Sequence, residues 1–384
     1  MDRVYVAVAA TAGLFVAVQL GALALVDPFV DAGFQMVEDP TDPSNSLVYV
    51  GAILVATAAM LGAMKYGVDR LLQGVIIFAA VFISFYVFTV VVPPAITVAG
   101  VNVLAVLAAL GLGAGLLLYP EWYVIDAAGV VMGAGAAGLF GISIGLLPAI
   151  VLLLVLAVYD AVSVYGTEHM LALASGAMDL RLPVVLVVPL TLSYSFLDEE
   201  GPESLEGESA SSDGGRAVTD DPDETGEIGD SDDETGEIGD SDDAGGETHG
   251  AIDPDGGTGD AVENRETQGD PSDPETPDDP VSRDAFFIGL GDAVIPTILI
   301  ASAAFFRPGD VPLLDVPGIA LTVPALGAMV GTIAGLLVLM SMVMRGRAHA
   351  GLPLLNGGAI AGYLVGATIA GVSIVEAIGV APYL

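Results

Sequence analysis

The sequence contains no cysteine, which excludes disulfide bonds, a thiolate nucleophile and metal sites with cysteine ligands. Histidine is almost as rare, because the chain has only His169, His249 and His349, which are far apart and form no His-Glu-x-x-His pattern. A zinc site built from histidine is therefore not expected. We expect the protein to use neither a metal ion nor another cofactor.

Basic residues are also few, with 10 Lys and Arg against 48 Asp and Glu and a formal net charge of -38. Nucleic-acid-binding surfaces need clustered Lys and Arg to contact phosphates, so nucleic acid is not an expected partner. A large acidic excess is typical of proteins from salt-loving archaea, which makes a halophilic archaeon the expected source. An ordinary acidic segment from any organism is the alternative.

Long apolar runs dominate the rest of the chain, in which 54% of the 384 residues are hydrophobic. Several runs approach the roughly 20 residues that a helix needs to cross a bilayer. We expect an all-α polytopic membrane protein with about nine transmembrane helices. The expected spans are Val4–Val26, Leu47–Met64, Leu71–Val92, Ala95–Leu118, Val124–Gly145, Leu146–Gly166, Ala285–Phe306, Gly318–Met344 and Leu352–Val380.

Most of the negative charge lies in one polar block between the sixth and seventh expected spans. The block contains Asp-Glu-Thr-Gly-Glu-Ile-Gly-Asp-Ser-Asp at 223–232 and again at 233–242. Low hydrophobicity with high net charge does not offset the entropy of ordering, so we expect residues 198–284 to be a disordered acidic loop. The loop divides the chain into an N-terminal membrane part, 1–197, and a C-terminal membrane part, 285–384.

Two shorter segments follow the sixth expected span. Residues 167–182 mix charged and apolar side chains, which favours an amphipathic helix at the membrane surface. Residues 183–189 are β-branched and bounded by prolines, and the run is too short to span a bilayer. We expect it to form an extended strand.

The basic residues predict the orientation, because loops on the cytoplasmic side are enriched in Lys and Arg. With nine alternating spans, only Arg307 falls on the outer side. The N-terminus and the acidic loop are then cytoplasmic, and the C-terminus is extracellular, in a multi-pass protein of the cell membrane. The basic residues near the inner ends of the spans are Arg3, Lys65, Arg70, Arg181, Arg283, Arg345 and Arg347.

Two aspartates, Asp160 and Asp292, lie inside apolar spans. An ionisable side chain at membrane depth costs about 2.5–3.5 kcal/mol on insertion scales and by default marks a functional site. The expected orientation puts both at a similar depth near the cytoplasmic side. If the carboxyls meet, they would share one proton and supply one acid and one base. The flanking Gly289 and Gly291 are expected to allow close backbone approach or to loosen the helix.

Tyr159-Asp160 in one span, Gly289-Leu290-Gly291-Asp292 in the next, and the long hydrophilic loop between them resemble the presenilin and signal peptide peptidase family of GxGD intramembrane aspartyl proteases. The family's Pro-Ala-Leu motif, at the start of the ninth span, is matched by Ala350-Gly351-Leu352, followed by Pro353. Alanine thus replaces the leading proline, and the literal Pro324-Ala325-Leu326 lies inside the eighth span. The cytoplasmic loop resembles presenilins, so an archaeal presenilin homologue is the best match.

The resemblance implies a presenilin-like bundle in which Asp160 and Asp292 activate a water that cleaves peptide bonds within transmembrane helices. Tyr159 is expected to pack beside the site. The substrate would be a membrane-protein helix in the lipid bilayer, and it must unwind before cleavage. Its freed backbone needs partners, which the expected strand could supply. The residues assigned to this pairing are Val184, Val185, Leu186 and Val187.

Other interpretations stay open from the residues alone. The aspartates could serve a secondary transporter or an ion channel, or the fold could be a catalytically inactive membrane scaffold. Gly133-Ala134-Gly135-Ala136-Ala137-Gly138 fits a nucleotide-binding pattern, but small residues in an apolar run favour close helix packing. Asp126, at the start of the fifth span, is expected at the membrane interface. The oligomeric state is not predicted.

Overall fold

The computed structural model describes residues 2–37, 39–42, 44–66, 68–166, 185–190, 285–345 and 350–380. Most of them are helical. The α-helices are α1 (Asp2–Asp31), α2 (Ser44–Lys65), α3 (Asp69–Val91), α4 (Val103–Leu118), α5 (Trp122–Ser143), α6 (Leu146–Gly166), α8 (Leu290–Phe306), α9 (Val323–Val343), α10 (Gly351–Ile369) and α11 (Ile374–Ala377). The remaining elements are the strands β1 (Thr97–Val98), β2 (Val101–Asn102), β3 (Val185–Pro189) and β4 (Ala285–Gly289) and the 3-10 helix η2 (Pro308–Asp310).

The described helices confirm the prediction of a polytopic helical membrane protein. Seven of them, α1, α2, α3, α5, α6, α9 and α10, are long and apolar enough to cross a membrane. The shorter apolar helices α4 and α8 occupy the fourth and seventh expected spans. Every expected span therefore contains an apolar helix.

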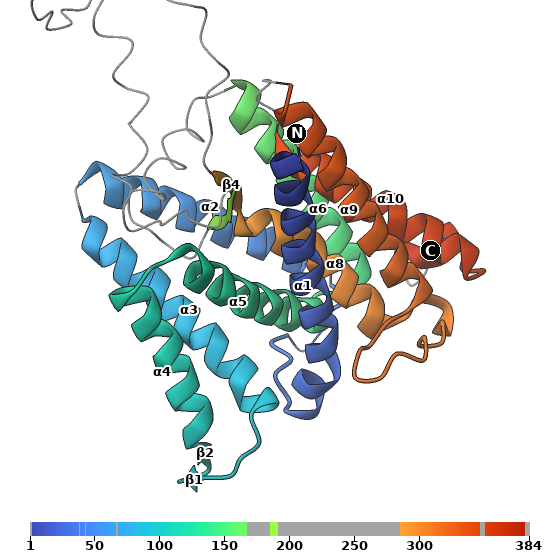
Figure 1. Ribbon diagram of the computed structural model, residues 1–384. Coiled ribbons are helices and arrows are strands. Elements are labelled where there is room, and N and C mark those ends of the chain that lie inside the picture. Colours follow the sequence, from blue (N-terminus) through green and yellow to red (C-terminus); the bar gives the residue numbers. More distant parts are fainter. Residues whose placement is uncertain are drawn as a thin grey trace, which may run out of the picture. The chain divides into compact units, whose positions relative to one another are not determined.

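Helix α5 lies at the centre of the bundle, in contact with α1, α3 and α8 (Figure 1). Its small residues make this possible. A Cβ atom added at Gly133 would lie 3.1 Å from Leu290 Cδ1 and 3.2 Å from Val294 Cγ2, both on α8. At Gly138 an added Cβ would meet the ring of Phe29 of α1 at 3.2 Å. The interpretation of this glycine-rich run as a packing surface is confirmed.

Helices α9 and α10 make the closest helix contact of the described fold. Their glycines face one another, so that a Cβ on Gly331 would overlap the carbonyl of Gly358, and one on Gly327 would overlap that of Gly362. Small residues at a helix interface let the backbones approach, which is the usual way of packing helices in lipid. This contact fixes α10, whose first turn lies at the candidate site described below.

Five expected boundaries differ from the structure by five residues or more, among them the end of the first span, which lies at Asp31, and the start of the eighth, which lies at Val323. The seventh expected span begins with strand β4, because its Phe-Phe-Ile sequence favours a strand and pairs with β3. The fourth begins with the β1–β2 hairpin, and its helix starts only where the Asn102 side chain accepts N–H groups of the first turn. The ninth ends at Ile369, shortly before Gly371 with φ 83°.

The predicted extended segment after the sixth span is present as β3, which pairs antiparallel with β4 in a two-stranded sheet. Sheet pairing joins the N-terminal and C-terminal membrane parts of the chain. The expected amphipathic helix at 167–182 lies outside the described residues. So does the expected acidic loop, 198–284.

Candidate active site

Asp160 lies in the last two turns of α6 and is 4% exposed. Its Oδ2 accepts the backbone N–H of Leu352 over 3.0 Å, and the carboxyl is also hydrogen-bonded to the N–H of Gly351. Gly351 and Leu352 are the first two residues of α10. Because the first N–H groups of a helix have no partner within it, they are available for an acidic side chain. The start of α10 therefore orients Asp160.

Asp292 lies in the first turn of α8, where Gly289 is the capping residue and provides no side chain to bond the free N–H groups. The positive end of the helix dipole therefore lies close to a half-buried carboxyl. Pro296, four residues later, has no N–H and cannot donate to the carbonyl of Asp292 as a helical residue would. The turn that carries Asp292 is thus held by fewer backbone bonds than a regular helix.

The two aspartates meet at the start of α10. A Cβ added at Gly351 would lie 3.6 Å from Asp292 Oδ2, while the N–H of the same residue bonds to Asp160. The two carboxyls are also close enough for their charges to interact. Residues from α6, α8 and α10, far apart in the sequence, therefore form one acidic site near the ends of these helices.

Of the two parts expected for Gly289 and Gly291, close backbone approach is not seen among the described residues, and loosening of the helix stays a prediction. Neither glycine has a positive φ, and a Cβ on Gly289 would make only an ordinary contact of 3.4 Å with Asp292 Oδ2. A Cβ on Gly291 would meet Ile295 Cδ1 at 3.9 Å. Within the described part of the chain, no other backbone lies within 4 Å of a Cβ added at either glycine. Both glycines are exposed, and only a side chain at Gly289 would contact Asp292.

Tyr159 and Pro353 occupy the edges of the site. Tyr159 is 38% exposed and stands next to Asp160 on α6. Pro353 is half-buried in the first turn of α10, where the missing N–H of a proline costs no helical bond. The Ala350-Gly351-Leu352 segment thus lies at the aspartates, whereas Pro324 is buried at the start of α9.

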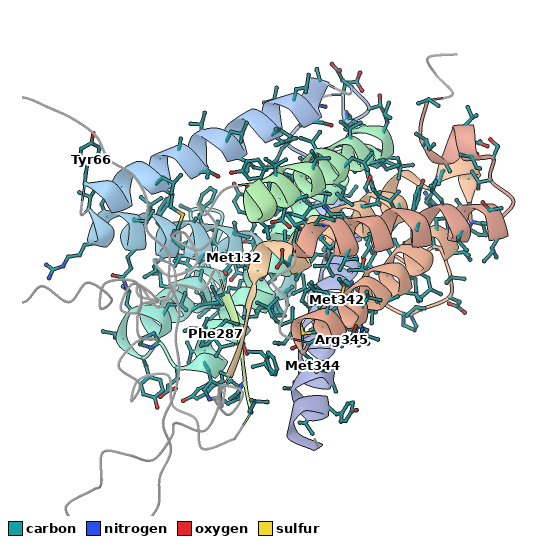
Figure 2. All side chains as sticks on the ribbon, turned by 90° about the horizontal axis from the view of Figure 1, so that it is seen from above. Tyr66, Met132, Phe287, Met342, Met344 and Arg345 are labelled. Atoms are coloured by element: carbon teal, nitrogen blue, oxygen red, sulfur yellow. The ribbon has the colours of Figure 1, made fainter. Side chains whose placement is uncertain are left out.

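The β3–β4 sheet leads directly into the site, because β4 ends at Gly289, next to the start of α8. Val185 of β3 lies opposite Gly289. Figure 2 shows Phe287 of β4 and Met132 of α5, which belong to the hydrophobic cluster that includes Leu186 and Val187. The cluster packs the sheet against α5.

Asp126 is the residue whose role sequence reasoning missed. Its expected place at the membrane interface stays a prediction, but the side chain is 7% exposed, and its Oδ1 accepts the N–H of Val187 of β3 over 2.8 Å. An acidic residue next to an apolar run is the same sequence signal that singles out Asp160 and Asp292. Val187 is 61 residues away in the sequence, so no local pattern connects them.

Metal binding has no obvious place in the described part of the chain, where no group of three or more His, Asp or Glu side chains lies close enough to hold an ion. The acidic site itself offers two carboxyls and backbone N–H groups. Two adjacent carboxyls can hold one proton between them and act as acid and base. A multi-pass membrane protein with two such carboxyls fits the class of membrane aspartic proteases.

Comparison with known proteins identifies the family. The sequence profile described as "Signal-peptide peptidase, presenilin aspartyl protease" matches residues 12–217 and 258–372, so the chain belongs to this family of intramembrane aspartic proteases. Its substrates are accordingly transmembrane proteins in a lipid bilayer. No curated protein sequence matches the chain significantly.

Two solved structures are similar over nearly the whole chain. Both are described as a presenilin family intramembrane aspartate protease, in the C222 and the P2 space group. The first is 28% identical with a TM-score of 0.55, and the match covers 94% of this chain and 99% of that one. The second is 26% identical with a TM-score of 0.52, covering 93% and 96%. The expected presenilin-like bundle is thereby confirmed.

Proposed function

We propose that the protein is a GxGD-type intramembrane protease whose catalytic pair is Asp160 and Asp292. The observation that carries the proposal is their meeting at the start of α10, where Gly351 bonds to one carboxyl and lies against the other. Backbone N–H groups of Gly351 and Leu352 fix the orientation of Asp160. Asp292 is half-buried and is flanked by the exposed Gly289 and Gly291.

The pair works as a general acid and a general base with one shared proton. The ionised carboxyl takes a proton from a water molecule, whose oxygen attacks the scissile carbonyl carbon. The protonated carboxyl donates a hydrogen bond to the carbonyl oxygen and later passes its proton to the leaving amide nitrogen, as the C–N bond breaks. The pair titrates as a unit, so neither role is assigned to one residue.

The substrate is a transmembrane helix that unwinds near the site, and its freed backbone groups join the β3–β4 sheet. Val187 donates to Asp126 rather than to β4, so Leu186 and Val188 make the bonds between the strands. Val185 and Gly289 form another pair without bonds between the strands, so the N–H and C=O groups of Gly289 point away from β3. Val185–Val187 form the inner strand of the sheet, so the added substrate strand is placed beside β4 and not beside these residues; Val184 lies outside the described residues.

The orientation also belongs to the proposal. The site lies where α6 ends and where α8 and α10 begin. Under the positive-inside rule these ends face the cytoplasm together with Lys65 and Arg345. Cleavage then takes place in the cytoplasmic half of the membrane, the N-terminus is cytoplasmic and the C-terminus is extracellular.

Purified full-length protein in detergent, incubated with a single-span substrate, tests the catalytic pair. Asp160→Ala and Asp292→Ala should each lower cleavage by at least about 10³-fold, since each removes one partner of the acid–base pair. Asp315→Ala is the matched control, because Asp315 is exposed in the loop between α8 and α9. Cleavage retained in either site variant would refute the pair. A folded wild type with no cleavage would favour the inactive scaffold.

A further inference from the structure

Asp126 is a buried acidic side chain that the proposed reaction does not use. It lies in the first two turns of α5, and the bond from Val187 N–H to its Oδ1 measures 2.8 Å. Val187 itself is 1% exposed. A buried backbone N–H is costly when it is left without a partner, and a bond to an acidic oxygen is among the strongest it can make. The bond therefore ties β3 firmly to α5.

The direction of the Val187–Asp126 hydrogen bond determines which edge of strand β3 Asp126 occupies. In an antiparallel pair, the N–H groups of successive residues point to opposite edges. Val187 lies opposite Phe287 and directs its N–H toward α5, away from β4. Asp126 thus occupies the outer edge of β3 at this residue, so an added strand cannot pair there.

A second contact of α5 supports helix α8, which follows strand β4. Gly133, two turns beyond Asp126, lies against Leu290 and Val294, which stand on either side of Asp292 in α8. Val185 lies opposite Gly289, the capping residue of α8. Helix α5 therefore supports β3 through Asp126 and α8 through Gly133, and β4 lies between these two supports.

We propose that Asp126 is a positioning residue for cleavage, which fixes the β3–β4 sheet through Val187 and thereby determines which substrate bond reaches Asp160 and Asp292. The inference rests on the proposed protease function. A shift of the sheet by about 3.3 Å, the advance of a strand per residue, presents the neighbouring peptide bond, and a smaller shift misplaces the original one.

Two substitutions of Asp126 in the full-length protein separate its hydrogen bond from its charge. Asp126→Asn keeps an acceptor oxygen, so kcat should stay within about threefold of wild type and the same bond should be cleaved. Asp126→Leu has a similar size but no acceptor. Its kcat should fall about tenfold or more, and mass spectrometry of the products should show cleavage at neighbouring bonds.

Either of two results would overturn the proposal. One is wild-type kcat and cleavage position in Asp126→Leu. The other is an equal loss in Asp126→Asn and Asp126→Leu with a changed pH profile in Asp126→Asn, which would mean that the reaction needs the charge of Asp126.

A variant that lacks the Val187 N–H tests the hydrogen bond to Asp126 by removing its donor. Val187→Pro deletes the N–H that Asp126 accepts and leaves the inter-strand bonds of Leu186 and Val188 in place. Alone, it should also spread the cleavage positions, even if Asp126→Leu does not fold. Combined with Asp126→Leu, it should add little further loss, because both changes remove one interaction. Fully additive losses, or unchanged cleavage in Val187→Pro, would contradict the proposal.

The two proposals fail in distinguishable ways. If the catalytic pair is wrong, Asp160→Ala retains cleavage in a chain with native Asp126. If only the positioning role is wrong, Asp160→Ala is inactive while Asp126→Leu cleaves the same bond at the wild-type rate.

Discussion

At the scale of single residues, the site depends on helix ends more than on helix interiors. Asp160 is held by the first N–H groups of α10, and Asp292 sits in the first turn of α8. Free N–H groups and the positive end of a helix dipole suit acidic side chains, which reduces the cost of placing two carboxyls at membrane depth. Pro296 removes one further bond from the turn around Asp292.

Substitutions of Gly289 test whether the substrate strand pairs with β4. The φ of −59° at Gly289 suits proline, so Gly289→Pro deletes an N–H that points away from β3 without straining the backbone. Cleavage should fall about tenfold or more if the substrate strand uses that N–H. Gly289→Ala keeps the N–H and adds a Cβ in ordinary contact with Asp292, so it should retain most of the activity. Equal activities of the two variants, measured on one substrate, would reject pairing at β4.

At the scale of elements, the contact between α9 and α10 fixes the helix that orients Asp160. The glycines that allow it lie on both helices, and Asn356 of α10 adds a polar link by donating to the carbonyl of Leu153 of α6 over 2.9 Å. This link lies about one turn beyond Leu352, which bonds to Asp160. Helix α10 is therefore held against α9 by close packing and against α6 by hydrogen bonds.

Alanine substitution of two glycines measures this packing. A Cβ on Gly331 would overlap the carbonyl of Gly358, whereas one on Gly357 meets nothing within 4 Å. Gly331→Ala should cost about 1–3 kcal/mol through overpacking and lower cleavage as α10 shifts. Gly357→Ala is the matched control and should be neutral or stabilising by up to about 1 kcal/mol. The measurement is the unfolding midpoint of each variant in detergent. Equal midpoints for Gly331→Ala and Gly357→Ala would contradict a tight contact between α9 and α10.

At the scale of the whole molecule, the orientation follows from the sorting of the basic residues. The chain has no cysteine, so single introduced cysteines report the side of the membrane without background. In intact cells, a membrane-impermeant thiol reagent should label Asp315→Cys and spare Tyr66→Cys, because Tyr66 follows α2 on the cytoplasmic side. Both positions are exposed. The reverse labelling pattern would invert the proposed topology.

Part of this fold could be predicted from local sequence. Apolar runs of helical length identify the membrane helices, and the high cost of acidic groups in them singles out Asp160 and Asp292. The β-branched residues between Pro183 and Pro189 indicate a strand by the same kind of local signal. The halophilic and archaeal source remains a prediction, since it follows from composition alone.

The membrane class, the order of the helices and the two aspartates Asp160 and Asp292 could be read from local sequence, because each depends on the chemistry of neighbouring residues. The partners of these residues became apparent only in the folded chain. Asp160 bonds to an N–H 192 residues away, and Asp126 to one 61 residues away. The start of strand β4 and the close backbone contact at Gly331 likewise depend on a partner segment. Hydrogen bonds and packing between distant segments leave no local pattern, so they appear only when the chain is folded.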